Sequence, residues 1–379
     1  MIKLISFTII NIDIMISSRF IILVSLILHF LFSTAAYSQT ENTISFYKIG
    51  DSKPGYGLKK MKYSKLFQGN KKDKNYFEGW YFKMVSEKGE SIISVIPGIS
   101  ISEKGDESHA FIQVINGKTG HTYYKSFHIN DFQFSTENFA VMIGENFFSE
   151  DSIVLNIKDD TFHLTGKVFM ENITDLTPQK KRNKRIMGIY RFIPFMQCYH
   201  GVVSLNHQLS GTLQLNEQQH AFDSGSGYIE KDWGSSMPAA WIWIQSNNFT
   251  TKNTSFMLSI ANIPWLGSHF TGFLGFFLNN GKVHRFGTYN RSKLEFDIIS
   301  QNQINITIKH KRLTYLIEAK QEKSGILIAP VNGSMDRRIS EGINAKLKIK
   351  DFNNKNQLIL SDSTTITGLE VVGDINILK

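Results

Sequence analysis

The chain has 379 residues, of which 41% are hydrophobic and 20% are charged, and this balance excludes an intrinsically disordered protein. The length favours two domains over one. The net charge is +9, but the basic residues are spread over Lys/Asn-rich stretches with one dense cluster at residues 180–185, so we exclude nucleic acid as the partner. That cluster predicts either a solvated loop or a peripheral contact with an anionic membrane surface.

Residues 1–38 are predicted to be a signal peptide. Arg19 precedes an apolar run at residues 20–32, and Ala36-Tyr37-Ser38 fits a small-x-small cleavage site before Gln39. The run is shorter than the roughly 20 apolar residues of a membrane span, and an uncleaved anchor is the alternative. We therefore predict an exported protein, periplasmic or extracellular, whose mature chain begins at Gln39.

Cys198 is the only cysteine, which excludes an internal disulfide and a cysteine-based metal cluster. Cys198 and the nearby His200 do not provide enough ligands to indicate a zinc site. We predict a buried thiol at Cys198 and no metal.

The rest of the chain is dominated by short apolar or alternating runs between turn signals. Asn116-Gly117 and Asn280-Gly281 favour tight hairpins, because their residues accept positive φ at little cost. This pattern predicts an all-β protein built from barrels or sandwiches. Its clearest strand candidates are residues 91–96, 110–115, 153–157, 201–205, 241–245, 255–260 and 304–308.

A turn cluster near the middle of the chain predicts the domain boundary. Residues 234–238, Gly-Ser-Ser-Met-Pro, separate a strand that ends at Trp233 from one that begins near Ala240. We therefore predict an N-terminal domain at residues 39–236 and a C-terminal domain at residues 237–379.

The first segment with candidate chemistry is residues 76–83. In a strand, Glu78, Trp80 and Phe82 share one face. A carboxyl beside two aromatic rings would be desolvated, and its raised pKa would suit a general acid. The alternative is a structural strand in which Glu78 pairs with a Lys or an Arg.

The second segment is residues 225–234, where Tyr228, Glu230 and Asp232 share a face and Lys231 and Trp233 point the other way. Two buried carboxyls this close cannot both ionise easily, so one would keep its proton. The alternative is an ion-paired strand at a domain junction.

Two further segments offer walls for a ligand. Trp241, Trp243 and Gln245 share a strand face that could hold a flat ring or a developing cation, and a tryptophan-rich core is the alternative. His200 is either an acid–base group or a structural histidine.

These segments, in this order, resemble the tocopherol cyclase family. Residues 76–83, 230–234 and 241–247 carry the resemblance, with Pro238 before the last, and it extends from about residue 60 to about residue 345. It implies two lipocalin-like antiparallel β-barrel domains. It also implies an activity, the cofactor-free cyclisation of a prenylated hydroquinone to a chromanol.

In the implied chemistry, a buried acid protonates the prenyl double bond and the phenol oxygen captures the resulting tertiary cation. The resemblance implies Glu78 and Glu230 as catalytic acids, with Asp232 as a further candidate. This chain departs from the family's pattern at Asp232, where the family is expected to have an amide, and around His200. The residues predicted to bind the substrate are Trp80, Phe82, Tyr228, Trp233, Trp241, Trp243, Gln245 and His200.

Two functions stay open at this point. The first is an isomerase of the intramolecular lyase type that acts on a hydrophobic isoprenoid without a cofactor, and the second is a non-catalytic lipocalin-like carrier in the cell envelope. The enzyme requires an acid inside an apolar cavity. We therefore predict that Glu78 and Glu230 point into one shared cavity, beside Trp80 and Trp241.

Overall fold

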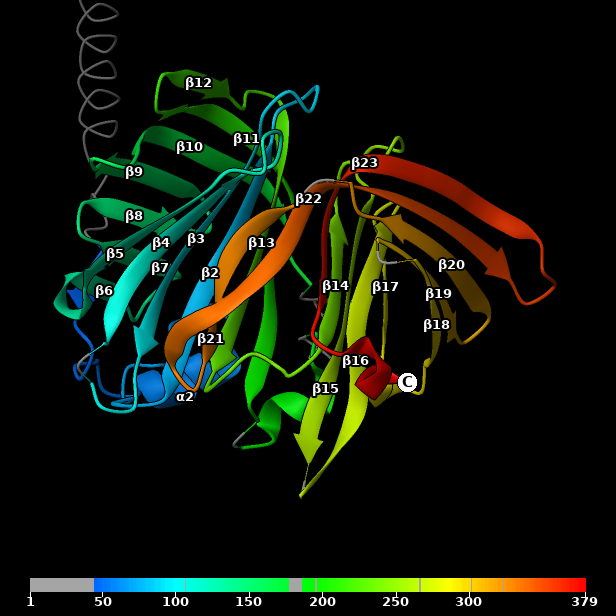
Figure 1. Ribbon diagram of the computed structural model, residues 1–379, viewed down its shortest axis with the longest axis horizontal. Helices are drawn as coiled ribbons and strands as arrows, with labels where there is room; N and C mark the ends of the chain where they lie inside the picture. Colours follow the sequence, from blue (N-terminus) through cyan, green and yellow to red (C-terminus); the bar gives the residue numbers. More distant parts are fainter. Residues whose placement is uncertain are drawn as a thin grey trace, which may run out of the picture. The chain divides into compact units, whose positions relative to one another are not determined.

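Alternating apolar residues form antiparallel strands throughout the computed structural model of the protein (Figure 1). The structure describes residues 44–105, 107–176, 186–194, 196–265, 267–300, 302–322 and 324–379. The predicted signal peptide and the basic cluster at residues 180–185 lie outside this part. The all-β prediction is confirmed as two antiparallel sheets within residues 45–379, which form one compact unit.

The first sheet takes its strands from residues 46–234. Their bounds are β1 (Phe46–Tyr47), β2 (Tyr76–Val85), β3 (Ile92–Ile101), β4 (His109–Asn116), β5 (Thr122–His128), β6 (Phe132–Ser135), β7 (Ala140–Ile143), β8 (Asn146–Ser149), β9 (Ser152–Lys158), β10 (His163–Thr174), β11 (Cys198–Leu215), β12 (Gln218–Ala221) and β13 (Gly225–Gly234). Within the described part, the hydrogen-bonded order is β1-β6-β7-β8-β9-β10-β11-β13-β2-β3-β4-β5, and β12 pairs with β11.

The second sheet follows in the chain. Its strands are β14 (Trp241–Ser246), β15 (Ser255–Trp265), β16 (Ser268–Asn279), β17 (Lys282–Gly287), β18 (Lys293–Ser300), β19 (Gln303–His310), β20 (Leu313–Lys320), β21 (Gly325–Val331), β22 (Ser334–Asn353) and β23 (Leu358–Val372). Their order is β17-β16-β15-β14-β23-β22-β20-β19-β18, and β21 pairs with β22. No recorded pairing of the described strands closes either sheet, so the lipocalin-like barrels stay a prediction.

Helical segments are short. They are α2 (Tyr56–Lys62) and the 3-10 turns η1 (Ile129–Asp131), η2 (Gly188–Phe192), η3 (Thr288–Asn290) and η4 (Ile375–Leu378). Among the described residues, no helix is long and apolar enough to span a membrane.

Local sequence signals predicted the strands well. All seven candidate runs lie in strands, apart from Ser91, which directly precedes β3. Asn280 and Gly281 form a two-residue turn between β16 and β17, with φ angles of 48° and 70°. Both positive angles match the turn that joins twisted antiparallel strands, which explains the Asn-Gly pair.

The strands of the two sheets divide near the predicted boundary. The first sheet ends with β13 at Gly234, and the second begins with β14 at Trp241. The hairpin of β21 and β22 nevertheless contacts the first sheet: Gln113 Nε2 donates to the carbonyl of Ile328 at 2.9 Å, and the Ile328 amide donates to Gln113 Oε1 at 2.9 Å. Whether residues 39–236 and 237–379 are separate domains stays a prediction.

Apolar side chains form three clusters. One lies in the first sheet around Trp80 and Phe132, and one lies in the second sheet around Phe256 and Tyr315. The third combines both sheets and includes Tyr81 and Trp243. Strand β2 is therefore buried along nearly its whole length, because its two faces pack in different clusters.

Candidate functional site

A cavity lies among residues of both sheets, and its lining is mostly apolar. The space among the lining residues is about 1360 Å³ when the open solvent at its mouth is counted. The apolar lining includes Tyr81, Phe111, Met187, Tyr190, Trp241, Trp243, Phe270, Leu274, Leu327 and Ile339. Its polar groups are few and concentrated, so they are the candidates for chemistry.

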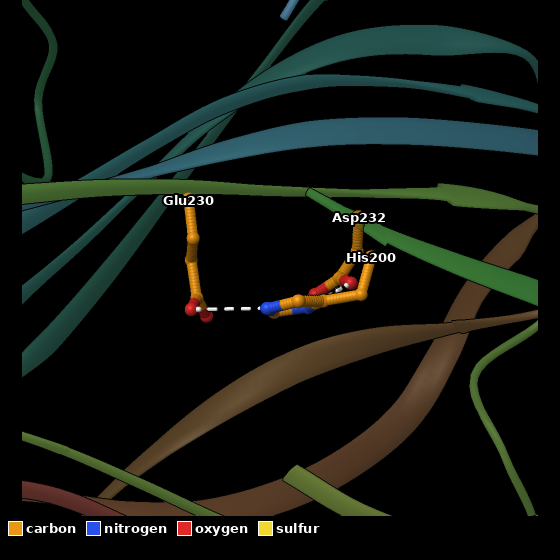
Figure 2. A group of neighbouring side chains, drawn as sticks. All are labelled: His200, Glu230 and Asp232. Carbon is orange, nitrogen blue, oxygen red and sulfur yellow. Dashed lines mark hydrogen bonds and ion pairs between the residues drawn. The ribbon is translucent and has the colours of Figure 1, made fainter. Parts of the chain in front are cut away.

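His200, Glu230 and Asp232 form a polar triad in this cavity (Figure 2). His200 lies on β11 directly opposite Asp232 on β13, and the ladder between these strands holds the pair together. Asp232 Oδ1 is 2.8 Å from His200 Nδ1, and Glu230 Oε2 is 3.4 Å from His200 Nε2. The imidazole ring therefore lies between the two carboxyl groups, with one ring nitrogen facing each.

The carboxyl group of Glu230 is held at one oxygen. Oε2 accepts hydrogen bonds from Tyr228 Oη at 2.6 Å and from Trp243 Nε1 at 3.2 Å. Oε1 has no hydrogen-bond partner among the described residues. Burial raises the pKa of Glu230 to about 7, the positive charge of His200 opposes this shift and Asp232 adds to it. Glu230 thus carries a proton in much of the population near neutral pH.

The charge of His200 follows from its neighbours. Burial lowers the pKa of His200, but Asp232 and Glu230 together outweigh burial and raise it to about 9. At neutral pH the ring is therefore an imidazolium that stabilises negative charge on either carboxylate.

The triad also has the composition of a metal site. One ligand atom from each of its three residues lies within 4.8 Å of the others. A nitrogen with two carboxylate oxygens suits a divalent transition metal. Each ring nitrogen already faces a carboxylate, however, so a metal would have to replace one of these contacts.

Two further acids, Glu341 and Glu370, line the cavity from the second sheet. Burial raises the pKa of Glu341 to about 7, and burial together with Glu341 raises the pKa of Glu370 well above its usual range. Sequence reasoning missed both residues. A signal was present, because Glu370 shares its strand face with apolar Val372 and the small Gly368.

Lys83 is a third missed polar group, and it lies behind the cavity lining. Its Nζ donates to Gln245 Oε1 at 3.0 Å. Burial lowers the pKa of Lys83 to about 7, and the negative charges of Glu341 and Glu230 oppose this shift. The alternation of residues 76–83 places Lys83 and Tyr81 on the face opposite Glu78, and that face is the one that meets the second sheet.

The prediction that Glu78 and Glu230 share a cavity is wrong. Glu78, Trp80 and Phe82 do share a strand face, but this face packs inside the first sheet and none of the three lines the cavity. The Glu78 carboxyl accepts from the backbone amides of Gln68 and Gly69 at 2.9 and 3.0 Å. Both faces of β2 are buried, so alternation could not tell which face meets the ligand.

Glu78 instead belongs to a buried ion pair. Its carboxyl pairs with Lys231 Nζ, and both side chains are completely buried. The ammonium lies between two indoles, 4.9 Å from the Trp80 ring and 4.8 Å from the Trp233 ring. The contacts of Glu78 thus support the alternative prediction, a structural strand in which Glu78 pairs with a lysine.

The other predicted residues divide into three groups. Trp241 and Trp243 line the cavity with the triad, and Cys198 is a half-buried thiol at the cavity rather than a fully buried one. Tyr228 and Gln245 lie behind the lining and hold Glu230 and Lys83. Trp233 points away from the cavity and stacks on Tyr199 with ring centroids 5.5 Å apart.

A family model described as tocopherol cyclase-like matches residues 167–373. Comparison with curated proteins finds no match. Among solved structures, the crystal structure of CghA with Sch210972 has a TM-score of 0.50 at 9% identity, covering 79% of this chain and 88% of CghA. An AttH-like protein from Nitrosomonas europaea has a TM-score of 0.47 at 13% identity, covering 78% and 92%. The likeness to CghA concerns the fold alone, and the family match includes the triad but not Glu78.

Proposed function

The chain belongs to the tocopherol cyclase-like family, and on this basis we propose that it is an enzyme that cyclises a prenylated hydroquinone, or a related isoprenoid, to a chromanol without a cofactor. The proposal includes the isomerase class, an exported location and lipocalin-like barrels. The observation that carries it is the environment of Glu230, a buried carboxyl group whose pKa is raised by burial to about 7, in an apolar cavity lined by two indoles.

Glu230 is the proton donor in this proposal. Among the described residues its Oε1 has no hydrogen-bond partner, whereas Oε2 is held by Tyr228 and Trp243, so the carboxyl group is oriented with Oε1 available to the substrate. The proton passes from Glu230 to the less substituted carbon of the prenyl double bond. A tertiary cation forms at the other carbon, and the faces of Trp241 and Trp243 stabilise it.

His200 and Asp232 support the acid. When Glu230 gives up its proton, a carboxylate is left in an apolar cavity, where it would be costly without a neighbouring cation. The imidazolium of His200 supplies that cation at 3.4 Å, and Asp232 keeps the ring charged and oriented at 2.8 Å. Asp232 and His200 are thus positioning residues for Glu230.

A carrier is the second candidate, and the mostly apolar, open cavity favours it. A carrier would bind the same class of hydrophobic ligand but would need no protonated carboxyl. The pKa of Glu230 near 7 is the feature that favours the enzyme over the carrier.

The test is incubation of the mature chain, from Gln39, with a phytylated methylbenzoquinol, followed by chromatography for the chromanol. We expect turnover, and we expect Glu230→Gln to reduce it by at least about 100-fold, because the amide cannot donate a proton of the required acidity. Asp351→Asn is the matched control, since Asp351 is a buried acid outside the cavity. Tight binding without turnover in the unaltered protein would favour the carrier.

A further inference from the structure

Glu341 and Glu370 occupy directly opposed positions on neighbouring strands. Glu341 on β22 pairs with Glu370 on β23, and Glu370 pairs with Trp243 on β14. Directly opposed residues of an antiparallel pair project from the same face of the sheet, and like charges there destabilise it. A pair of acids at this place, in a mostly apolar cavity, has no evident role in stability.

Glu341 has an oxygen that nothing in the described protein satisfies. The side chain is 0% exposed, and Oε1 accepts from Tyr81 Oη at 2.7 Å. Oε2 is also buried, and it has no hydrogen-bond partner among the described residues. A buried carboxyl oxygen without a partner is unfavourable, so an unsatisfied atom on a cavity wall points to a ligand group that completes it.

Glu370 completes the arrangement. Its Oε2 accepts from Trp241 Nε1, which ties this acid to the predicted indole wall. Glu341 is fully buried and Glu370 is half-buried, and the ladder places them opposite each other. Neighbouring carboxyl groups that interact titrate as a pair, and over a range of pH such a pair holds one proton. Such a pair both donates and accepts hydrogen bonds, which matches a hydroxyl group, and its ionised member can take the hydroxyl proton.

We propose that Glu341 and Glu370 form a binding site for a hydroxyl group of the ligand and that Glu341 accepts the proton of this hydroxyl during ring closure. The second part rests on the proposed function. The hydroxyl oxygen forms a bond to the cationic carbon, its O–H bond breaks, and the proton moves to Glu341 Oε2. Glu230 adds one proton at the double bond, and the hydroxyl group releases one proton to Glu341. The product therefore has the same composition as the substrate, and the reaction is an isomerisation without oxidation or reduction.

The position of Tyr81 supports the assignment of Glu230 as the proton donor and Glu341 as the proton acceptor. Tyr81 pairs with Glu230 in the ladder between β13 and β2, and its hydroxyl reaches Glu341 on the second sheet. The proton donor and the proposed acceptor therefore lie on different sheets of one cavity. A ligand between them can present its double bond to Glu230 and its hydroxyl to Glu341.

The binding part is tested with two probes, a phytylated methylbenzoquinol and its dimethyl ether, which lacks hydroxyl groups. Affinities are measured by quenching of tryptophan fluorescence or by calorimetry. We expect the unaltered protein to bind the quinol about tenfold more tightly than the ether, a difference worth one good hydrogen bond. Glu341→Leu should reduce the preference to within about twofold, and Asp351→Asn, on the same strand, should retain it.

Glu341→Gln tests the proton transfer. It also keeps the proposal testable if the Glu341→Leu variant does not fold. The amide keeps hydrogen bonding but cannot accept a proton, so the quinol preference should persist while chromanol formation falls at least about 30-fold. Equal affinity of the unaltered protein for quinol and ether overturns the hydroxyl site. Undiminished turnover in Glu341→Gln overturns its role as acceptor. A clear quinol preference without any chromanol refutes the proposed function and leaves the hydroxyl site standing.

Discussion

The four carboxyl groups in one apolar cavity differ in their immediate neighbours. Glu230 faces the imidazolium of His200, whereas Glu341 receives a hydrogen bond from Tyr81 and is affected by the charges of Glu230 and Lys83. Burial raises the pKa of Glu230 and of Glu341 to about 7. The identity of a residue thus says little about its role here, and the groups within about 4 Å decide which acid donates a proton.

The pH dependence of turnover follows from these neighbours. We expect kcat/KM to rise as Glu341 loses its proton and to fall as Glu230 loses its proton, which gives a narrow bell near pH 7. In His200→Gln the cation that lowers the pKa of Glu230 is gone, so the falling limb should move to higher pH by about one unit. Measurement of kcat/KM from pH 5 to about pH 9 checks this. An unmoved falling limb in His200→Gln would contradict the assignment of Glu230.

At the scale of elements, β2 and β13 carry both a structural face and a functional face. The ladder places Trp80 opposite Lys231 and Trp233 opposite Glu78, so the four side chains of the ion-pair cluster meet on one face. The other face presents Glu230 and Tyr81 to the cavity. The motif that first suggested catalysis at Glu78 therefore holds together the strand pair that positions the acid.

The ion pair between Glu78 and Lys231 should be a stability determinant. Lys231→Met leaves a buried carboxylate without its cation, and we expect the free energy of unfolding to fall by about 3–5 kcal/mol. The double variant with Glu78→Gln should regain part of this loss, because no uncompensated charge remains. Urea unfolding followed by fluorescence measures both. A Glu78→Gln protein with unaltered stability and no turnover would return Glu78 to the catalytic candidates.

At the scale of the whole molecule, exposed apolar side chains adjoin one end of the cavity. Ile189 and Phe192 on η2 are 66% and 63% exposed, and Trp265 is 39% exposed. They flank the lining residues Tyr190 and Phe270, whose rings are 6.0 Å apart. Arg191 lies over the Phe192 ring at 4.2 Å and adds a positive charge to this rim. We propose that this apolar surface with its cation, in a chain of net charge +9, makes a peripheral contact with an anionic lipid surface.

The rim should therefore bind membranes weakly. We expect the mature protein to sediment with anionic phosphatidylglycerol vesicles more than with neutral phosphatidylcholine vesicles, and less at high salt. The pair Ile189→Asp and Phe192→Asp should lower this binding about tenfold, because two apolar anchors become charged. Leu358→Asp is the control, since Leu358 is 55% exposed on β23 and does not line the cavity. Equal sedimentation of the rim variant and the control would exclude this surface.

Much of the fold could be predicted from local sequence. The strand runs and the Asn280-Gly281 hairpin depend on neighbours in the chain, and the structure confirms both. Residues 235–240, which include most of the predicted turn cluster, form the irregular connection between β13 and β14. The sharing of one face by Glu230 and Asp232 is confirmed for the same reason. A side-chain period of two is a local property of any strand.

Which residues come together in the site could not be predicted from local sequence. Glu341 and Glu370 lie more than 100 residues after the triad in the sequence. They line the same cavity only because the sheet that contains β22 and β23 packs against the first sheet. For Glu78 the period of two left two buried faces, and only the packing of Trp80 against the first sheet showed which face is core. Periodicity is set by adjacent residues, whereas burial on both faces and contacts between distant strands arise when the sheets assemble.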